Sequence, residues 1–171
     1  NAVTVFSAML ARRSDGQPLA QLTGQREFWS MPIMVNEHTL VPRPETELLV
    51  ERALTKIPEA ESANVLELGT GSGAIAIALA TERPHCVITA TDNDQQTLAV
   101  ARDNAARLCA DRINFAQGSW YTALPSGEAK FGLIVSNPPY IATTATELTD
   151  PELVFEPYAA LYSGSDGLDA L

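Results

Sequence analysis

The stretch Asn64-Val-Leu-Glu-Leu-Gly-Thr-Gly-Ser-Gly-Ala74 runs from an apolar segment straight into a glycine-rich turn. Its first five residues are predicted to form a buried strand, because they are mostly large apolar side chains in a short run. From about Ala74 to Thr81 the sequence predicts a helix that is apolar on nearly every face, which indicates burial between layers. The turn fits G-x-G-x-x-[G/A], in which glycines permit positive φ and a close approach of the backbone to a ligand. This strand, turn and helix are the first unit expected of a parallel α/β sheet.

Three further strands are predicted downstream. They are Cys86–Thr91, Ile113–Ala116 and Phe131–Val135, and an amphipathic helix over Asp94–Leu108 separates the first two of them. Such alternation of strands and helices predicts βαβ units and a parallel sheet with right-handed crossovers. Four parallel strands would leave the fourth as a bare edge, through which we expect this chain to associate or aggregate.

Shorter elements are predicted on both sides of the sheet. Residues 3–13 indicate an amphipathic helix, and residues 26–41 indicate a β-hairpin that turns at Asn36-Glu37. A helix is expected to start at Pro44, because proline suits the first turn of a helix. Near the end of the chain, the Ser165-Asp166 pair is expected to supply the cap of a further helix.

The glycine turn and the next strand together indicate an adenosine-bearing ligand. Asp92 closes the second strand about 20 residues after the turn, where dinucleotide-binding sheets carry an acidic residue for the ribose hydroxyls. NAD and S-adenosyl-L-methionine (SAM) are the two alternatives. Glu67 favours SAM, because a carboxylate suits a sulfonium ligand with a free amino group better than a pyrophosphate. The same carboxylate equally suits a structural role, bonding the N–H groups of the loop. Trp120, after the third strand, can pack on an adenine, although a core position fits it as well.

The fourth strand ends at Ser136-Asn-Pro-Pro-Tyr140, where two prolines stop the ladder and impose an extended loop. In an open α/β sheet this edge is where ligands bind. A planar amide or exocyclic amino nitrogen is a weak nucleophile, because its lone pair is delocalised. The side-chain oxygen of Asn137 and the Pro138 carbonyl can accept its two hydrogens, which orients the nitrogen and favours tetrahedral geometry during methyl transfer. Tyr140 can stack on the planar group, and no general base is required.

Composition narrows the class of protein. The 171 residues suffice for one domain with a core, and a formal net charge of −10 with only two lysines opposes a nucleic-acid surface. No apolar run is long enough to span a bilayer and no signal-peptide pattern is visible, so a cytoplasmic protein is expected. Cys86 and Cys109 fit no metal-ligand or CxxC spacing, and two buried free thiols are expected.

Asn137-Pro-Pro-Tyr140, with Glu67-Leu-Gly-Thr-Gly-Ser-Gly73 upstream, resembles the class I methyltransferases that modify planar amino groups. Three more stretches narrow the resemblance: Leu22-Thr-Gly-Gln-Arg-Glu-Phe-Trp29, Val41-Pro-Arg-Pro-Glu-Thr-Glu47, and Phe155-Glu-Pro157 with Ala160-Leu161 and Gly164-Ser-Asp-Gly167. From about Pro18 onward the chain resembles the HemK/PrmC release-factor glutamine methyltransferases.

This resemblance implies a Rossmann-like fold and a SAM-dependent enzyme of translation termination. The implied acceptor is the side-chain amide nitrogen of the glutamine in the Gly-Gly-Gln motif of class 1 peptide-chain release factors. The implied second product is S-adenosyl-L-homocysteine, and the release factor is the implied partner.

The family's motifs also imply roles for particular positions. Asn137, Pro138 and Tyr140 would be catalytic, and Pro139 would join them in holding the substrate glutamine. Ser119 stands where the family usually has an acidic residue, which leaves a polar contact near the adenine without its usual group. No metal is expected. The residues expected to contact SAM are Glu67, Gly69, Thr70, Gly71, Ser72, Gly73, Asp92, Trp120 and Asn137.

The resemblance further implies truncation at both ends, since members carry a helical N-terminal domain and three more strands after the fourth. The expected division is a remnant of that domain over residues 1–24, a β-hairpin linker over 25–43, and an incomplete methyltransferase domain over 44–171. Two alternatives stay open: an N-methyltransferase acting on a ribosomal-protein glutamine or a nucleic-acid amino group, and a SAM-binding fragment without activity. No direct contact with nucleic acid or membrane is expected.

Overall fold

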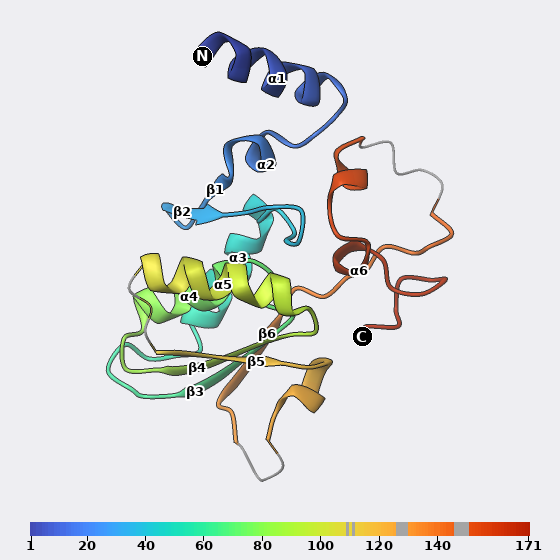
Figure 1. Cartoon of the computed structure of the whole chain (residues 1–171). Helices are drawn as coiled ribbons and strands as arrows, with labels where there is room; N and C mark the ends of the chain where they lie inside the picture. Colours follow the sequence, from blue (N-terminus) through green and yellow to red (C-terminus); the bar gives the residue numbers. More distant parts are fainter. Residues whose placement is uncertain (109, 111, 126–129, 146–150) are drawn as a thin grey trace.

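The central sheet has four parallel strands in the order β5-β4-β3-β6 (Figure 1). The computed structural model describes residues 1–108, 110, 112–125, 130–145 and 151–171. Each strand coincides with a predicted one to within two residues, and β6 lies at an edge of the sheet, as expected. Association through that edge stays a prediction. The strands are β3 (Asn64–Leu68), β4 (Val87–Asp92), β5 (Ile113–Gln117) and β6 (Leu133–Ser136).

Three helices pack on one face of this sheet: α3 (Glu47–Leu54), α4 (Ala74–Glu82) and α5 (Gln95–Arg107) (Figure 1). α4 is buried over most of its length, as its apolar sequence predicts. α5 begins after Asp94, whose Oδ1 accepts a hydrogen bond from the Gln96 amide at 2.9 Å. The core lies between these helices and the sheet. It includes Val50, Ala53, Val65, Ile75, Ile77, Leu79, Ile88 and Val135.

The predicted hairpin is present, but the predicted turn at Asn36-Glu37 is wrong. β1 (Gln25–Phe28) and β2 (Met31–Met34) are antiparallel, and Trp29 and Ser30 join them with φ of 52° and 57°. The backbone N–H of Trp29 donates to Glu47 Oε1, and its indole N–H donates to Glu82 Oε1, both at 2.8 Å. These bonds to α3 and α4 stabilise a left-handed conformation that non-glycine residues rarely adopt.

Asn104 of α5 ties the hairpin to the glycine turn. Its side chain is buried, with 1% of the residue exposed. Oδ1 accepts a hydrogen bond from the Met34 amide at 2.8 Å, and Nδ2 donates to the carbonyls of Met34 and Ser72, each at 2.9 Å. One amide therefore fixes the end of β2 relative to the loop that follows β3.

The remaining N-terminal elements are short or exposed. α1 (Ala2–Ser14) is the helix predicted at the start of the chain, and none of its residues is buried. α2 (Leu19–Thr23) is not indicated by the sequence, because five residues carry too little periodicity. The helix expected from Pro44 opens with a 3-10 turn, η1 (Pro44–Thr46), and continues as α3.

The chain closes with η3 (Pro151–Phe155) and α6 (Tyr158–Leu161). The helix expected after Ser165-Asp166 is wrong: Asp166 Oδ1 accepts a hydrogen bond from the Leu168 amide at 3.0 Å, which closes a turn instead. Cys86 is a buried free thiol, as predicted, whereas Cys109 lies outside the described residues. Within the described ranges, no helix combines the length and hydropathy needed to cross a membrane.

Candidate functional site

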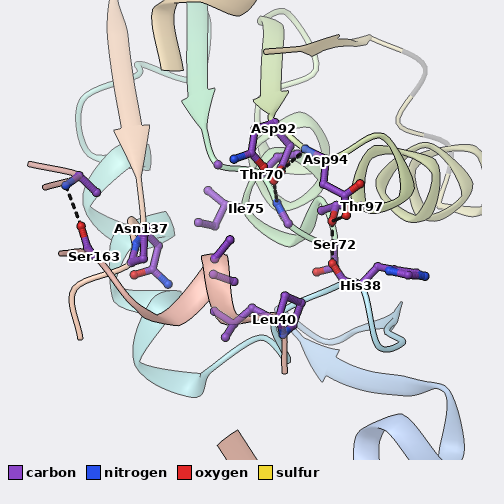
Figure 2. A pocket seen from close by; sticks show the side chains of 18 of the residues that line it. His38, Leu40, Thr70, Ser72, Ile75, Asp92, Asp94, Thr97, Asn137 and Ser163 are labelled. Atoms are coloured by element: carbon purple, nitrogen blue, oxygen red, sulfur yellow. Dashed lines mark hydrogen bonds between the residues drawn. The ribbon is translucent and has the colours of Figure 1, made fainter. Parts of the chain in front are cut away.

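A cavity of about 440 Å³ lies at the carboxyl edge of the sheet (Figure 2). Its volume falls within the range of roughly 300–1,000 Å³ that is usual for small-molecule sites. Every strand of the sheet contributes to its lining at or just beyond the strand's end. The contributors include residues 69–72 of the glycine turn after β3, Asp92 of β4, Trp120 after β5 and Asn137 after β6, whereas Gly73, also predicted to contact the ligand, is not part of the lining. These predicted residues therefore surround one space.

The glycine turn is held by contacts from two neighbouring elements. The N–H of Thr70 donates to a β4 carbonyl at 2.8 Å, and the N–H of Gly71, at φ 57°, donates to Asp92 Oδ2 at 3.0 Å. Gly73 has φ 83°, and a Cβ there would lie 3.2 Å from the Cβ of Ala101 in α5. The turn therefore packs against α5 at a distance that suits glycine, while its first part borders the cavity.

The Asp92 carboxylate borders the cavity beside this turn. Burial raises the pKa of this carboxyl, and hydrogen bonds from the N–H groups of Gly71 and Asp94 oppose that rise. Oδ2 accepts from Gly71 and Oδ1 accepts from Asp94 at 3.2 Å. Each oxygen keeps a further lone pair, so the group can still accept hydrogen bonds from ligand hydroxyls.

Glu67 does not line the cavity. Its side chain is fully buried, and its Oε2 accepts hydrogen bonds from the Thr70 hydroxyl at 2.7 Å and the Ala76 amide at 3.1 Å. Burial raises the pKa of this carboxyl to about 8, and within the described residues Oε1 has no hydrogen-bond partner. This position does not support the expected direct contact with a ligand. It agrees with the structural alternative, in which the carboxyl fastens the glycine turn to the first turn of α4.

Trp120 and Ser119 line the cavity from the segment after β5. Trp120 opens η2 (Trp120–Ala123) with φ 50° and belongs to neither hydrophobic core cluster of the described residues. A Cβ on the preceding Gly118 would lie 2.6 Å from Cα of Ala123, so only glycine allows the chain to fold back here. The tryptophan is therefore placed at the cavity by a local turn and not by core packing.

The loop after β6 brings Asn137 and Pro139 to the cavity. The Asn137 Nδ2 group donates to Thr46 Oγ1 at 3.4 Å. Pro138 and Tyr140 are not part of the lining, and Tyr140 is 68% exposed. Of the residues predicted to hold the acceptor, the structure thus places two at the cavity and leaves the tyrosine ring open to solvent.

The chain beyond this loop is fastened to the C-terminal segment. The Ile141 amide donates to the Leu161 carbonyl, and the Ser163 amide donates to the Ile141 carbonyl, both at 2.9 Å. Gly167 has φ 83°, and a Cβ there would lie 2.4 Å from the carbonyl oxygen of Tyr140. A glycine at this position therefore lets the C-terminal segment close tightly behind the Asn-Pro-Pro-Tyr loop.

Two walls of the cavity were not assigned by sequence reasoning. One comes from the loop before α3, where Leu40 lies across the cavity from Thr70 and Asp92 (Figure 2). The other comes from α6 and the residues after it. A buried carboxylate links the loop to the segment that leads into α6: the half-buried Arg43 donates to Glu156 Oε1 at 2.5 Å, and the Val41 amide donates to Glu156 Oε2 at 2.9 Å.

In the sequence, Arg43 stands between two prolines, and Glu156 follows an apolar run and precedes a proline. Nothing local pairs them. In the described part of the chain, no group of His, Cys, Asp and Glu side chains has an arrangement suited to a metal ion.

Proteins named release factor glutamine methyltransferase are similar to almost the whole chain. The one from Xylella fastidiosa (strain 9a5c) is 51% identical over 170 residues, which cover 99% of this chain and 61% of that protein. The one from Escherichia coli (strain K12) is 47% identical over 163 residues, covering 95% and 58%. The chain thus spans about three fifths of the length of these curated relatives.

Solved structures and a family model agree with the sheet described above. The N-terminal domain of human METTL16 matches with a TM-score of 0.54 at 17% identity, covering 79% of this chain and 64% of that one. At this identity the likeness is one of fold, and it supports the Rossmann-like sheet expected from the sequence. The model of the methyltransferase small domain matches residues 44–164, from the start of η1 to the C-terminal segment behind the cavity. The chain therefore belongs to the methyltransferase small domain family.

Proposed function

We propose that this chain carries the site of a SAM-dependent methyltransferase that acts on the glutamine side-chain amide in the Gly-Gly-Gln motif of class 1 release factors. The observation that carries the proposal is the meeting of two loops at one cavity. These are the glycine turn after β3 and the Asn137-Pro-Pro-Tyr140 loop after β6. The first suits an adenosine-bearing ligand and the second suits a planar amide, and both border the same space.

The residues around the cavity fit SAM. Asp92 retains acceptor capacity for ribose hydroxyls, Trp120 offers an aromatic surface to an adenine, and the glycine turn permits close approach of the backbone. Glu67 would act from behind the turn and hold its shape. When bound, SAM supplies an electrophilic methyl group on a sulfonium sulfur.

The loop after β6 supplies what the acceptor needs. Asn137 Oδ1, which borders the cavity, and the Pro138 carbonyl, which lies just outside its lining, would accept the two hydrogens of the amide nitrogen. This draws the nitrogen lone pair out of conjugation and orients it. Tyr140, exposed at the end of this loop, would stack on the planar group as the acceptor enters from solvent. The methylated nitrogen is acidic and releases its proton readily, so no residue has to act as general base.

The identity of the acceptor is supported by the relatives. Proteins with 47–51% identity over at least 95% of this chain carry release factor glutamine methyltransferase as their name. The net charge of −10 opposes a nucleic-acid acceptor, which would favour a basic surface. A protein loop that presents a glutamine to the cavity is the acceptor that suits both observations.

Mass spectrometry tests the proposal. A class 1 release factor is incubated with SAM and the chain, then digested, and the Gly-Gly-Gln peptide is examined for one added methyl group on the glutamine. Methylation by wild type and none by Asn137→Ala is the expected result. Methylation of a ribosomal protein or nucleic acid in place of the release factor would overturn the acceptor. A lack of saturable SAM binding in calorimetry would overturn the cofactor.

A further inference from the structure

The Asn137 amide has an end that donates hydrogen bonds and an end that accepts them. Its Nδ2 donates to Thr46 Oγ1 at 3.4 Å, and within the described residues no donor reaches its Oδ1. Both residues border the cavity. The proposed reaction requires the accepting end to face the substrate, so the bond to Thr46 occupies the end that would otherwise repel an incoming N–H group.

Thr46 is itself held in a short and rigid turn. It ends η1, where its amide donates to the Arg43 carbonyl at 3.0 Å, and Pro44 restricts φ at the start of the same turn. The hydroxyl of Thr46 is therefore presented from a fixed backbone position, 91 residues away from Asn137 in the sequence.

The start of that turn is anchored by Glu156. The glutamate side chain has no exposed surface, and its two oxygens accept hydrogen bonds from the Arg43 guanidinium and the Val41 amide. A buried carboxylate bonded at both oxygens resists displacement, because losing the Arg43 bond would leave a buried charge unpaired and losing the Val41 bond would leave a buried oxygen without its donor. Glu156, Arg43 and Thr46 thus form a continuous path of contacts to Asn137.

We infer that Thr46 is a positioning residue, which holds the Asn137 amide with its oxygen towards the acceptor and is itself supported by the Arg43–Glu156 pair. The inference rests on the proposed function for its catalytic consequence. Its structural part, the orientation of the amide, does not depend on any reaction.

The test compares Thr46→Val, which keeps the shape but loses the hydroxyl, with Thr46→Ser, which keeps the hydroxyl. Thr55→Val is the matched control: Thr55 is exposed after α3, and its hydroxyl also makes one hydrogen bond, donating to the Arg52 carbonyl at 2.7 Å. Two readouts are taken on the full chain. One is the side-chain amide resonance of Asn137, assigned by its loss in Asn137→Asp, and the other is kcat for glutamine methylation at saturating SAM.

In Thr46→Val we expect faster hydrogen exchange of the Asn137 amide and a fall in kcat of about three- to tenfold, the rate equivalent of one hydrogen bond. The Kd for SAM stays within about twofold, since one lost contact outside the ligand leaves binding energy unchanged. Thr46→Ser restores both readouts, and Thr55→Val changes neither. An Asn137 resonance that is the same in wild type and Thr46→Val would overturn the inference, as would a Thr46→Ser variant as impaired as Thr46→Val. If the wild type transfers no methyl group, the proposed function fails, while the resonance still decides the role of Thr46.

Discussion

Replacing Glu67 with glutamine should change how the stability of this protein depends on pH. The carboxyl is fully buried, and its pKa lies near 8 in the folded state against 4.5 without that burial. A glutamine at this position has the same shape as the protonated acid. Its side-chain oxygen can accept the bonds that Oε2 now accepts from Thr70 and Ala76, but it cannot ionise.

The sign follows from proton binding. Between pH 4.5 and about 8 the folded protein keeps the Glu67 proton and the unfolded chain loses it, so the free energy of unfolding falls as pH rises. The stabilisation from this group is complete below pH 4.5 and is lost as pH rises through 8. A tenfold change in proton affinity is worth about 1.4 kcal/mol. The gap from 4.5 to about 8 therefore amounts to at most about 5 kcal/mol, and Glu67→Gln should remove that dependence.

Urea unfolding followed by circular dichroism, at intervals from pH 5 to pH 8.5, measures the effect. From pH 5 to pH 8.5, the free energy of unfolding of Glu67→Gln should rise by about 3–5 kcal/mol relative to that of wild type. Glu51→Gln, a change at an exposed position of α3, serves as the control and should parallel wild type. Asp92, whose pKa burial also raises, contributes the same trend to all three proteins. If the free energy of unfolding of Glu67→Gln changes with pH as that of wild type does, Glu67 is ionised in the folded protein, and the expectation of a buried neutral carboxyl is refuted.

Three more substitutions test other parts of the site. Asn137→Ala should lower the rate of glutamine methylation by at least about a hundredfold and leave the calorimetric Kd for SAM largely unchanged; a large loss of SAM affinity would assign Asn137 to the cofactor. Asn104→Asp should lower the free energy of unfolding by about 3–5 kcal/mol, because it removes the donors to Met34 and Ser72 and buries a charge against their carbonyls; a change below about 1 kcal/mol in urea titrations would contradict this account. Gly118→Ala should lower the free energy of unfolding by about 1–3 kcal/mol, since its Cβ would lie 2.6 Å from the Ala123 backbone. It should also shift the fluorescence of Trp120; an unchanged spectrum would show that the turn does not determine the position of this side chain.

The parts of the fold that short-range patterns encode were predictable. The strand, glycine turn and helix of residues 64–81, and Asp92 at the end of the next strand, follow from apolar runs and glycine spacing. The turn at Trp29 and Ser30 was not predictable, because bonds to Glu47 and Glu82 stabilise positive φ at residues with no local preference for it. The sequence left the role of Glu67 open between contact with a ligand and support of the glycine turn. Only its complete burial in the structure favours support of the turn.

Contacts between segments that are distant in the sequence could not be predicted either. The bonds from Asn104 to Met34 and from Asn137 to Thr46 span 70 and 91 residues. In neither pair does the local sequence around one residue indicate its partner. Polar side chains in such contacts resemble surface residues until the tertiary structure shows what covers them.

The Arg43–Glu156 pair also bears on the order in which the protein matures on the ribosome. The two residues are 113 positions apart, and a ribosome adding about 5–20 residues per second needs roughly 6–23 s to make the intervening chain. During that interval the Arg43 guanidinium and the Val41 amide lack the carboxylate that they bond, although the strands β3, β4 and β5 can already pair and Thr97 can already donate to the His38 carbonyl in the same loop. The cavity wall that this loop forms is therefore completed only when Glu156 has emerged. A nascent chain arrested before that point would hold a folded glycine turn and an open, unfinished pocket.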